Sequence, residues 1–209
     1  MGHRKVILIA LTGAARSGKD SCADRLVERH NFTKISFAAP LKQALRATDP
    51  WIGFHPNHPG ELVRLSEALA NETEDAIKQL FPEYRRLLEK LGTEGIRAID
   101  DGFWKRAALN QCSGAADDAR FVFPDARFQN EVDAVKEWAL DLDDRPIGGE
   151  IAEAWHIVRP SLVGPVGESH ASAVLHGNLG EDREVVNDST LEDLNSIVDA
   201  IVEELEGGE

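Results

Sequence analysis

A glycine-flanked loop that ends in lysine is the part of the sequence with the clearest chemistry. The pattern Gly-x-x-x-x-Gly-Lys spans Gly13 to Lys19, between an apolar run that starts at Val6 and a helix-period pattern that starts at Ser21. In such a loop the backbone N–H groups point inward, the N-terminus of the helix adds partial positive charge, and the lysine reaches the outer phosphates of a nucleotide. The loop is therefore predicted to bind a nucleotide through Gly13, Ala14, Ala15, Arg16, Ser17, Gly18, Lys19, Asp20 and Ser21.

The residue after Lys19 departs from the usual form of this pattern. The position is ordinarily Ser or Thr, whose hydroxyl binds Mg²⁺, whereas here it is Asp20, with Ser21 next. Two interpretations stay open. Either Asp20 meets the metal, directly or through water, or Ser21 supplies the hydroxyl.

A carboxylate ends another apolar segment further along the chain. Residues 119–125 are predicted to form a strand that ends in Asp125, with Arg127 two positions on. An Asp at the end of the strand beside the loop strand is suited to organise Mg²⁺ and the attacking oxygen. Asp125 is therefore a metal and catalytic candidate, although it could instead orient the acceptor or cap a helix or turn. Arg127 would point into the same crevice.

Four further side chains are candidates for contacts with substrate. Lys42 follows the second predicted strand and could face a substrate phosphate or be a solvated helix lysine. Arg97 lies among apolar and small residues and could form a fork onto a phosphate. Trp104 could stack on a base or pack a local core, and composition favours packing. Arg159 precedes a segment rich in Gly and Pro and could neutralise transition-state charge, as could Arg16 inside the loop.

The elements that must position these residues alternate between strands and helices. Five strands are expected, at residues 6–12, 33–38, 119–125, 154–159 and 183–188. The helices between them predict a three-layer α/β/α fold of the P-loop type, with a central parallel sheet and the loop strand in its middle. The chain is expected to form one domain over residues 1–209.

A largely helical insertion at about 46–115 is expected to form the wall of an acceptor pocket. Within it, Asp49 to Glu61 is predicted to be a loop, and Leu62 to Leu69 and Glu72 to Leu80 are predicted to be helices. Residues of about 159–180 are predicted to form a flexible lid.

Composition limits the partners of the protein. The 209 residues carry a formal net charge of −14, which argues against nucleic acid or an anionic membrane as the main partner. Cys22 and Cys112 fit no metal pattern, and the N-terminal apolar run is too short for a signal peptide or a membrane span. A cytoplasmic protein with reduced thiols is expected, and a homodimer is left open.

Several segments, in order along the chain, resemble bacteriophage deoxynucleoside monophosphate kinases. They are Gly13 to Ser21, Ile35 to Lys42, Leu91 to Glu94 with Asp101 to Trp104, Asp125 to Glu131, and Val186 to Leu191. The resemblance implies Mg²⁺-dependent transfer of the ATP γ-phosphate to a deoxynucleoside monophosphate, giving the diphosphate, in the host cytoplasm. It also makes Asp20 an expected residue of the loop.

The predicted roles follow from the motifs and the resemblance together. The catalytic candidates are Lys19, Asp125, Arg16 and Arg159. The acceptor candidates are Lys42, Arg97, Trp104 and Arg127. The metal candidates are Asp20, Ser21 and Asp125.

Other functions fit the same loop. The acceptor could belong to another small-molecule kinase, such as one for dephospho-coenzyme A or for phosphomevalonate. A nucleotide-dependent switch or accessory protein would bind nucleotide without transferring phosphate to a small molecule. An insertion that carries Arg97 and Trp104 favours a second substrate pocket over a switch.

Overall fold

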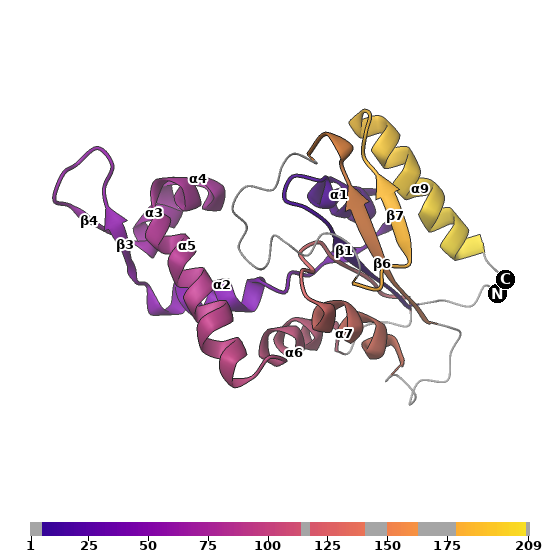
Figure 1. Cartoon of the computed structure of the whole chain (residues 1–209), viewed down its shortest axis with the longest axis horizontal. Helices are drawn as coiled ribbons and strands as arrows, with labels where there is room; N and C mark the ends of the chain where they lie inside the picture. The colour runs from indigo at the N-terminus through magenta and orange to yellow at the C-terminus, as the bar shows by residue number, and fades with distance from the viewer. Residues whose placement is uncertain (1–5, 114–117, 141–149, 163–178, 208–209) are drawn as a thin grey trace. The chain divides into compact units, whose positions relative to one another are not determined.

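The computed structural model describes residues 6–113, 118–140, 150–162 and 179–207. The chain divides into two compact units, one of Met1–Phe37 with Ala108–Glu209 and one of Ala38–Ala107. The first unit contains a parallel sheet in the order β2-β5-β1-β6-β7 (Figure 1). Its strands are β1 (Val6–Thr12), β2 (Thr33–Lys34), β5 (Arg120–Phe123), β6 (Glu150–Val158) and β7 (Arg183–Val186). The predicted five-stranded sheet with the loop strand in its middle is confirmed.

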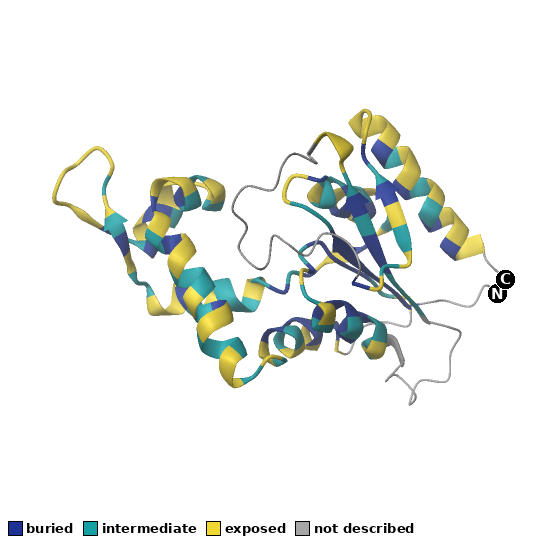
Figure 2. Cartoon of the chain, viewed as in Figure 1, coloured by how far each residue is buried: buried dark blue, intermediate teal, exposed yellow. Residues whose placement is uncertain are grey.

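Strand β1 is central because both of its faces are apolar. All of its residues are buried, and Figure 2 shows dark blue concentrated in the middle of this sheet. Alternate side chains of a strand point to opposite faces. Leu8 and Ala10 accordingly join the core on one face, and Ile7, Ile9 and Leu11 join the core on the other.

Helices cover both faces of this sheet. Helices α1 (Lys19–His30) and α9 (Leu191–Gly207) pack against the face that includes Ile9, through residues such as Leu26 and Val198. Helix α7 (Gln129–Leu140) and the 3₁₀ helix η2 (Asn110–Cys112) cover the opposite face. Figure 1 shows α7 and α9 on opposite sides of the sheet. The three-layer arrangement is therefore confirmed. A second 3₁₀ turn, η3 (Pro160–Leu162), follows β6.

Local signals place the ends of the two helices that flank the site. Helix α1 lies between Gly18 and Asn31, which both have positive φ. Before α9, the Asp193 backbone N–H donates to Thr190 Oγ1 at 3.2 Å, and the Thr190 N–H donates to Asp193 Oδ2 at 3.2 Å. This reciprocal pair is a capping box, and it fixes the start of α9.

The second unit has its own small core. Its elements are α2 (Ala39–Thr48), β3 (Trp51–Phe54), β4 (Leu62–Arg64), α3 (Leu65–Asn71), α4 (Glu74–Leu80), α5 (Pro82–Glu89), the π-helix η1 (Lys90–Arg97) and α6 (Phe103–Leu109), which runs on into the first unit. Leu45, Ile52, Leu65, Ile77 and Tyr84 are among its buried residues. No helix in the described part of the chain combines the length and the apolar character needed to cross a membrane.

The loop predicted from Asp49 to Glu61 is wrong over Trp51–Phe54, which form a strand. Strands β3 and β4 form an antiparallel pair, in which Ile52 and Val63 are buried. Pro56, Pro59 and Gly60 lie in the connection between the two strands, whereas Gly53 lies within β3. The helix predicted to start at Leu62 instead starts at Leu65. Arg64 precedes its first turn and donates its backbone N–H to Glu67 Oε2 at 2.8 Å.

Two strand boundaries also differ from the prediction. The strand predicted at 33–38 forms a ladder only over Thr33–Lys34, although the Ile35 N–H still donates to the Val122 carbonyl at 2.9 Å. Ser36 and Phe37 instead donate hydrogen bonds to the Asp125 carboxylate. Strand β6 begins at Glu150, earlier than predicted, because its residues from Glu150 to His156 pair with all of β1. Most of the predicted lid lies outside the described residues.

Candidate active site

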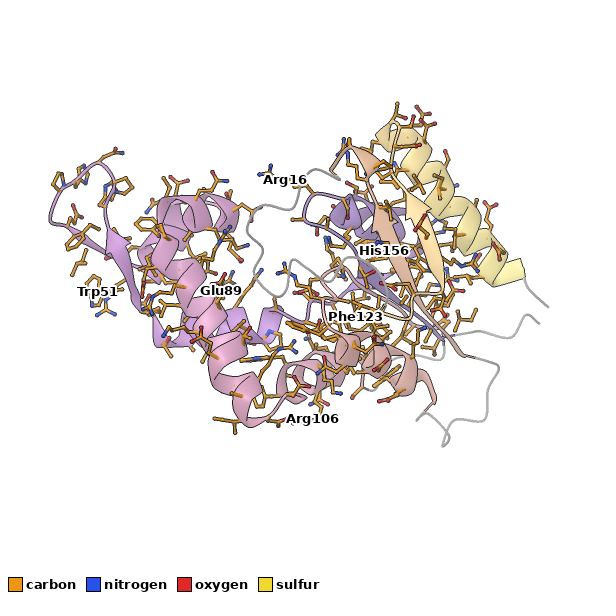
Figure 3. The ribbon with its side chains drawn as sticks, viewed as in Figure 1. Arg16, Trp51, Glu89, Arg106, Phe123 and His156 are labelled. Atoms are coloured by element: carbon orange, nitrogen blue, oxygen red, sulfur yellow. The ribbon has the colours of Figure 1, made fainter. Side chains whose placement is uncertain are left out.

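The loop between β1 and α1 needs glycine at both of its ends. Gly13 has a φ of 127°, and a Cβ there would lie 2.3 Å from the carbonyl oxygen of Ile157. Gly18 has a φ of 112°, and a Cβ there would lie 2.5 Å from the Asn187 side-chain nitrogen. Both backbone conformation and close packing therefore exclude larger residues. Arg16, labelled in Figure 3, is exposed and has a positive φ of 65°.

Lys19 reaches back across this loop. Its Nζ donates hydrogen bonds to the carbonyl of Gly13 at 2.8 Å and to that of Ala14 at 2.6 Å. Burial lowers the pKa of Lys19, and so does the nearby charge of Arg127, while Asp20 and Asp125 oppose the shift. A bound anion would favour the charged ammonium, so the site is electrostatically suited to phosphate.

Asp125 lies at the carboxyl end of β5, which is the neighbour of β1 as predicted. Its Oδ2 accepts from Ser36 Oγ at 2.6 Å, and its Oδ1 accepts from the Phe37 N–H at 2.9 Å. The carboxylate thus holds the end of β2 against the end of β5. Carboxylate oxygens are ligands that Mg²⁺ prefers, so Asp125 stays a candidate for metal binding.

Arg127 is placed by the start of α7. Its backbone N–H donates to Glu131 Oε2 at 2.8 Å, and the Phe128 N–H donates to the same oxygen at 3.2 Å. Glu131 is buried, so this turn is fixed, while the Arg127 residue is exposed. The charges of Asp125 and Arg127 both act on Lys19, so the structure brings these two residues to its surroundings.

A cavity of about 400 Å³ adjoins the loop. Its lining residues are Arg16, Gly18, Lys19, Asp20, Ser21, Arg159, Asn187, Ser189, Leu191 and Leu194. Cavities of this size are typical of small-molecule sites. Arg16 and Arg159 thus share one cavity with Lys19, whereas Asp125 is not among its lining residues.

Asp20 and Ser21 differ in their surroundings. The Asp20 side chain is 84% exposed, and its Oδ1 lies 3.4 Å from Lys34 Nζ, which also donates to Asp24 at 2.9 Å. Ser21 is half-buried at the start of α1. Both line the cavity, so both remain candidates for the metal contact.

The other acceptor candidates lie in the second unit. Lys42 Nζ pairs with Glu74 Oε1 at 2.8 Å, and Arg97 Nη1 lies 3.5 Å from Asp101 Oδ1. Burial alone would raise the pKa of Glu74, but the hydrogen bond and charge of Lys42, together with Lys78, lower it. Both cations therefore have carboxylate neighbours.

Trp104 is a packing residue of the second unit. It is 4% exposed, its Nε1–H donates to the Gly92 carbonyl at 3.1 Å, and its ring meets Phe103 edge-on. A ring enclosed in this way does not present its face to a base. The prediction that Trp104 stacks on the acceptor base is corrected on this ground.

Two polar contacts behind the loop were missed from the sequence. The Asn187 Nδ2 donates to the Ser17 carbonyl at 2.8 Å. Thr12 Oγ1 donates to Glu181 Oε1 at 2.9 Å and lies 3.0 Å from Nδ1 of His156, its register partner on β6, which Figure 3 labels. The only local signal was a polar residue at the carboxyl end of each strand, because the partners are distant in sequence.

No family model matches the chain. A mimivirus (Acanthamoeba polyphaga mimivirus) protein named "Putative deoxynucleotide monophosphate kinase" is 26% identical, over 95% of this chain and 97% of that protein. A solved structure, that of TT1252 from Thermus thermophilus, is 15% identical, covers 97% of this chain and 98% of its own, and has a TM-score of 0.46. Structural similarity at that level shows neither a shared fold nor a shared activity.

Proposed function

We propose that the protein transfers the γ-phosphate of ATP to a deoxynucleoside monophosphate and so forms the diphosphate. The observation that carries this proposal is the loop itself. It has a lysine that spans it, glycines that its packing requires, and an adjoining cavity of about 400 Å³. This arrangement is suited to hold the phosphates of a nucleotide at the N-terminus of α1.

The donor is expected to bind along the cavity. Its phosphates would lie against the loop, with Lys19 at the outer phosphates, and its nucleoside would extend toward Ser189 and Leu191 at the start of α9. Arg16 and Arg159 line the same space and are placed to neutralise charge that develops during transfer.

Mg²⁺ fits the oxygen atoms near the loop. The ion prefers hard oxygen ligands, and it is ordinarily held by one or two protein oxygens together with phosphates and water. Asp20, Ser21 and Asp125 offer such oxygens. Within the described residues, no group of three or more His, Cys, Asp or Glu could hold a metal unaided. When bound, Mg²⁺ would neutralise part of the phosphate charge.

The acceptor phosphate is assigned to Arg127, with Lys42 and Arg97 as further candidates. Arg127 influences Lys19 electrostatically, yet it does not line the cavity proposed for the donor. An arginine near Lys19 but outside the donor cavity is suited to bind the phosphate of a second substrate. The similarity to the mimivirus protein supports a nucleotide as the acceptor, since its name states that substrate class.

A screen of phosphate acceptors with ATP and Mg²⁺ tests the proposal. We expect ADP formation to depend on a deoxynucleoside monophosphate, and Lys19→Ala to reduce it by several orders of magnitude while the protein stays folded. A lysine at the transferring phosphate acts mainly in the transition state, which is why the loss is large.

Each alternative has its own outcome in that screen. Turnover only with dephospho-coenzyme A or phosphomevalonate would identify another small-molecule kinase. Slow ATP hydrolysis that no acceptor changes would indicate a nucleotide-dependent switch. Near-normal turnover by Lys19→Ala would contradict the assignment of the loop.

A further inference from the structure

We propose that Asn187 is a positioning residue, which orients the peptide bond between Ser17 and Gly18 and thereby aims the loop at the donor phosphates. This inference rests on the proposed function to the extent that the loop binds a phosphate. Asn187 lines the cavity proposed for the donor, but its side-chain nitrogen faces the loop backbone, so we assign its effect to the loop rather than to contact with the phosphate.

The hydrogen bond between Asn187 and Ser17 is buried, and only one assignment of donor and acceptor is possible. Asn187 is 8% exposed, and its side-chain nitrogen lies 2.8 Å from the Ser17 carbonyl oxygen. A carbonyl oxygen can only accept, so the group that faces it must be the NH₂ of the amide. The contact therefore fixes the orientation of the Asn187 side chain as well as that of the Ser17 carbonyl.

Fixing this carbonyl also fixes the next N–H group. The described residues contain no cis peptide bond, and in a trans peptide the C=O and the following N–H point in opposite directions. With the Ser17 carbonyl held toward Asn187, the Gly18 N–H must point away from Asn187, in the opposite direction within the same peptide plane. In a phosphate-binding loop that N–H is one of the donors available to the anion.

Without this contact the peptide would be free to turn. Gly18 has a φ of 112°, and glycine passes readily between backbone conformations that other residues avoid. The close approach also depends on glycine, because a Cβ at position 18 would lie 2.5 Å from the Asn187 amide nitrogen. Asn187 thus holds the peptide bond that precedes one of the two glycines of the loop.

Asn187 is itself anchored to the sheet. Its backbone N–H donates to the Val158 carbonyl at 2.7 Å, where the end of β7 meets the end of β6. Donors that are fixed before the ligand arrives need no reorganisation during binding or reaction. The sheet, through Asn187, supplies this rigidity to the loop.

The test compares ATP affinity, by calorimetry, and steady-state kinetics in Asn187→Asp and Asn187→Ala. The Asp variant is nearly isosteric but places an acceptor against the Ser17 carbonyl, and the Ala variant removes the contact without adding charge. We expect about 10- to 100-fold weaker ATP binding and a similar rise in the KM for ATP. The KM for the acceptor should change by less than about twofold, since the loop serves the donor. Asp188→Asn, an exposed neighbour, is the matched control and should behave as the wild type.

Other outcomes would overturn the inference in distinguishable ways. ATP binding and KM that stay unchanged in a folded Asn187→Asp variant would overturn it while leaving the proposed function intact. An equal rise in the KM values for ATP and for the acceptor, or failure of both variants to fold, would show that Asn187 has a purely structural role. A wild-type protein that binds no ATP would overturn the proposed function and this inference together.

Discussion

Positive charge is concentrated at the loop of a protein whose formal net charge is −14. Lys19 shares its cavity with Arg16 and Arg159, and Arg127 is near enough to lower the pKa of Lys19 in addition to the effect of burial. Cations held this close repel one another, and the repulsion costs free energy. A phosphate group would offset that cost, so the same repulsion becomes part of the affinity for the ligand.

Arg127 gives a prediction at the scale of one residue. Arg127→Ala should raise the KM for the acceptor at least about tenfold and change the KM for ATP much less, because a lost charged hydrogen bond to phosphate costs about 1.5–3 kcal/mol. The acceptor KM of Arg127→Lys should lie between those of the wild type and Arg127→Ala, since lysine keeps the charge but loses the fork geometry. Steady-state kinetics with each substrate varied in turn provide the measurement.

Arg29→Ala is the control for this experiment, since Arg29 is exposed on α1 and does not line the cavity. Its kinetics should match those of the wild type. An effect of Arg127→Ala on ATP alone would move Arg127 to the donor side.

Helices α1 and α9 are joined by a charged cluster as well as by the core. Arg25 donates to both carboxylate oxygens of Asp199, and His30 Nε2 lies 2.7 Å from Asp199 Oδ1. These contacts, with that of Arg25 first, lower the pKa of Asp199 from its ordinary value of 3.8 to about 2. Because α1 starts at the loop, the cluster holds the element that presents Lys19.

Asp199→Asn should therefore destabilise the protein in a pH-dependent way. The carboxylate stabilises the folded state fully above the pKa of the unfolded chain and loses this effect as the pH falls from about 4 to about 2. We expect the variant to melt a few degrees below the wild type at pH 7, with a difference that shrinks below pH 4. Thermal unfolding followed by circular dichroism across this range is the measurement.

Glu203→Gln, an exposed position on the same helix, serves as the control for general charge effects. It should leave the melting temperature nearly unchanged at every pH. A difference between Asp199→Asn and the wild type that persists undiminished near pH 2 would show that the carboxylate charge is not its source.

At the scale of the molecule, the chain separates two groups of residues. The loop, Asp125, Arg127 and the cavity belong to the first unit, whereas Lys42 and Arg97 belong to the second. Each unit has a core of its own. We infer that donor binding is a property of the first unit and that phosphate transfer needs both.

Replacing residues 38–107 by a short Gly/Ser linker tests this division. Phe37 and Ala108, which flank the second unit, belong to one buried cluster, so a short linker should join them. The shortened protein should fold, bind ATP within about threefold of the wild type, and lose transfer to any acceptor. Calorimetry and the acceptor assay measure the two effects. A folded, shortened protein that no longer binds ATP would show that the second unit contributes to the donor site.

The sequence by itself determined the parts of this protein that depend on neighbouring residues. The apolar run of β1, the glycine-flanked loop and the period of α1 lie within the first thirty residues, and the structure has them where they were predicted. The five-stranded parallel sheet followed as well, because alternating strands and helices allow few other arrangements. The β3–β4 hairpin was missed because prolines and glycine in its connection obscured a short alternating pattern.

Only the tertiary structure decided which distant residues support the loop. Asn187 and Ser17 are 170 positions apart, and Thr12 and Glu181 are 169 apart, so no local periodicity links them. The burial of Trp104 likewise depends on how η1 and α6 pack, since an aromatic residue in sequence fits a core and a binding site equally well. The physical reason is common to these cases: hydrogen bonds and burial between distant segments form only when the chain has folded. The glycines that allow the positive φ angles of the loop, in contrast, are visible in the sequence itself.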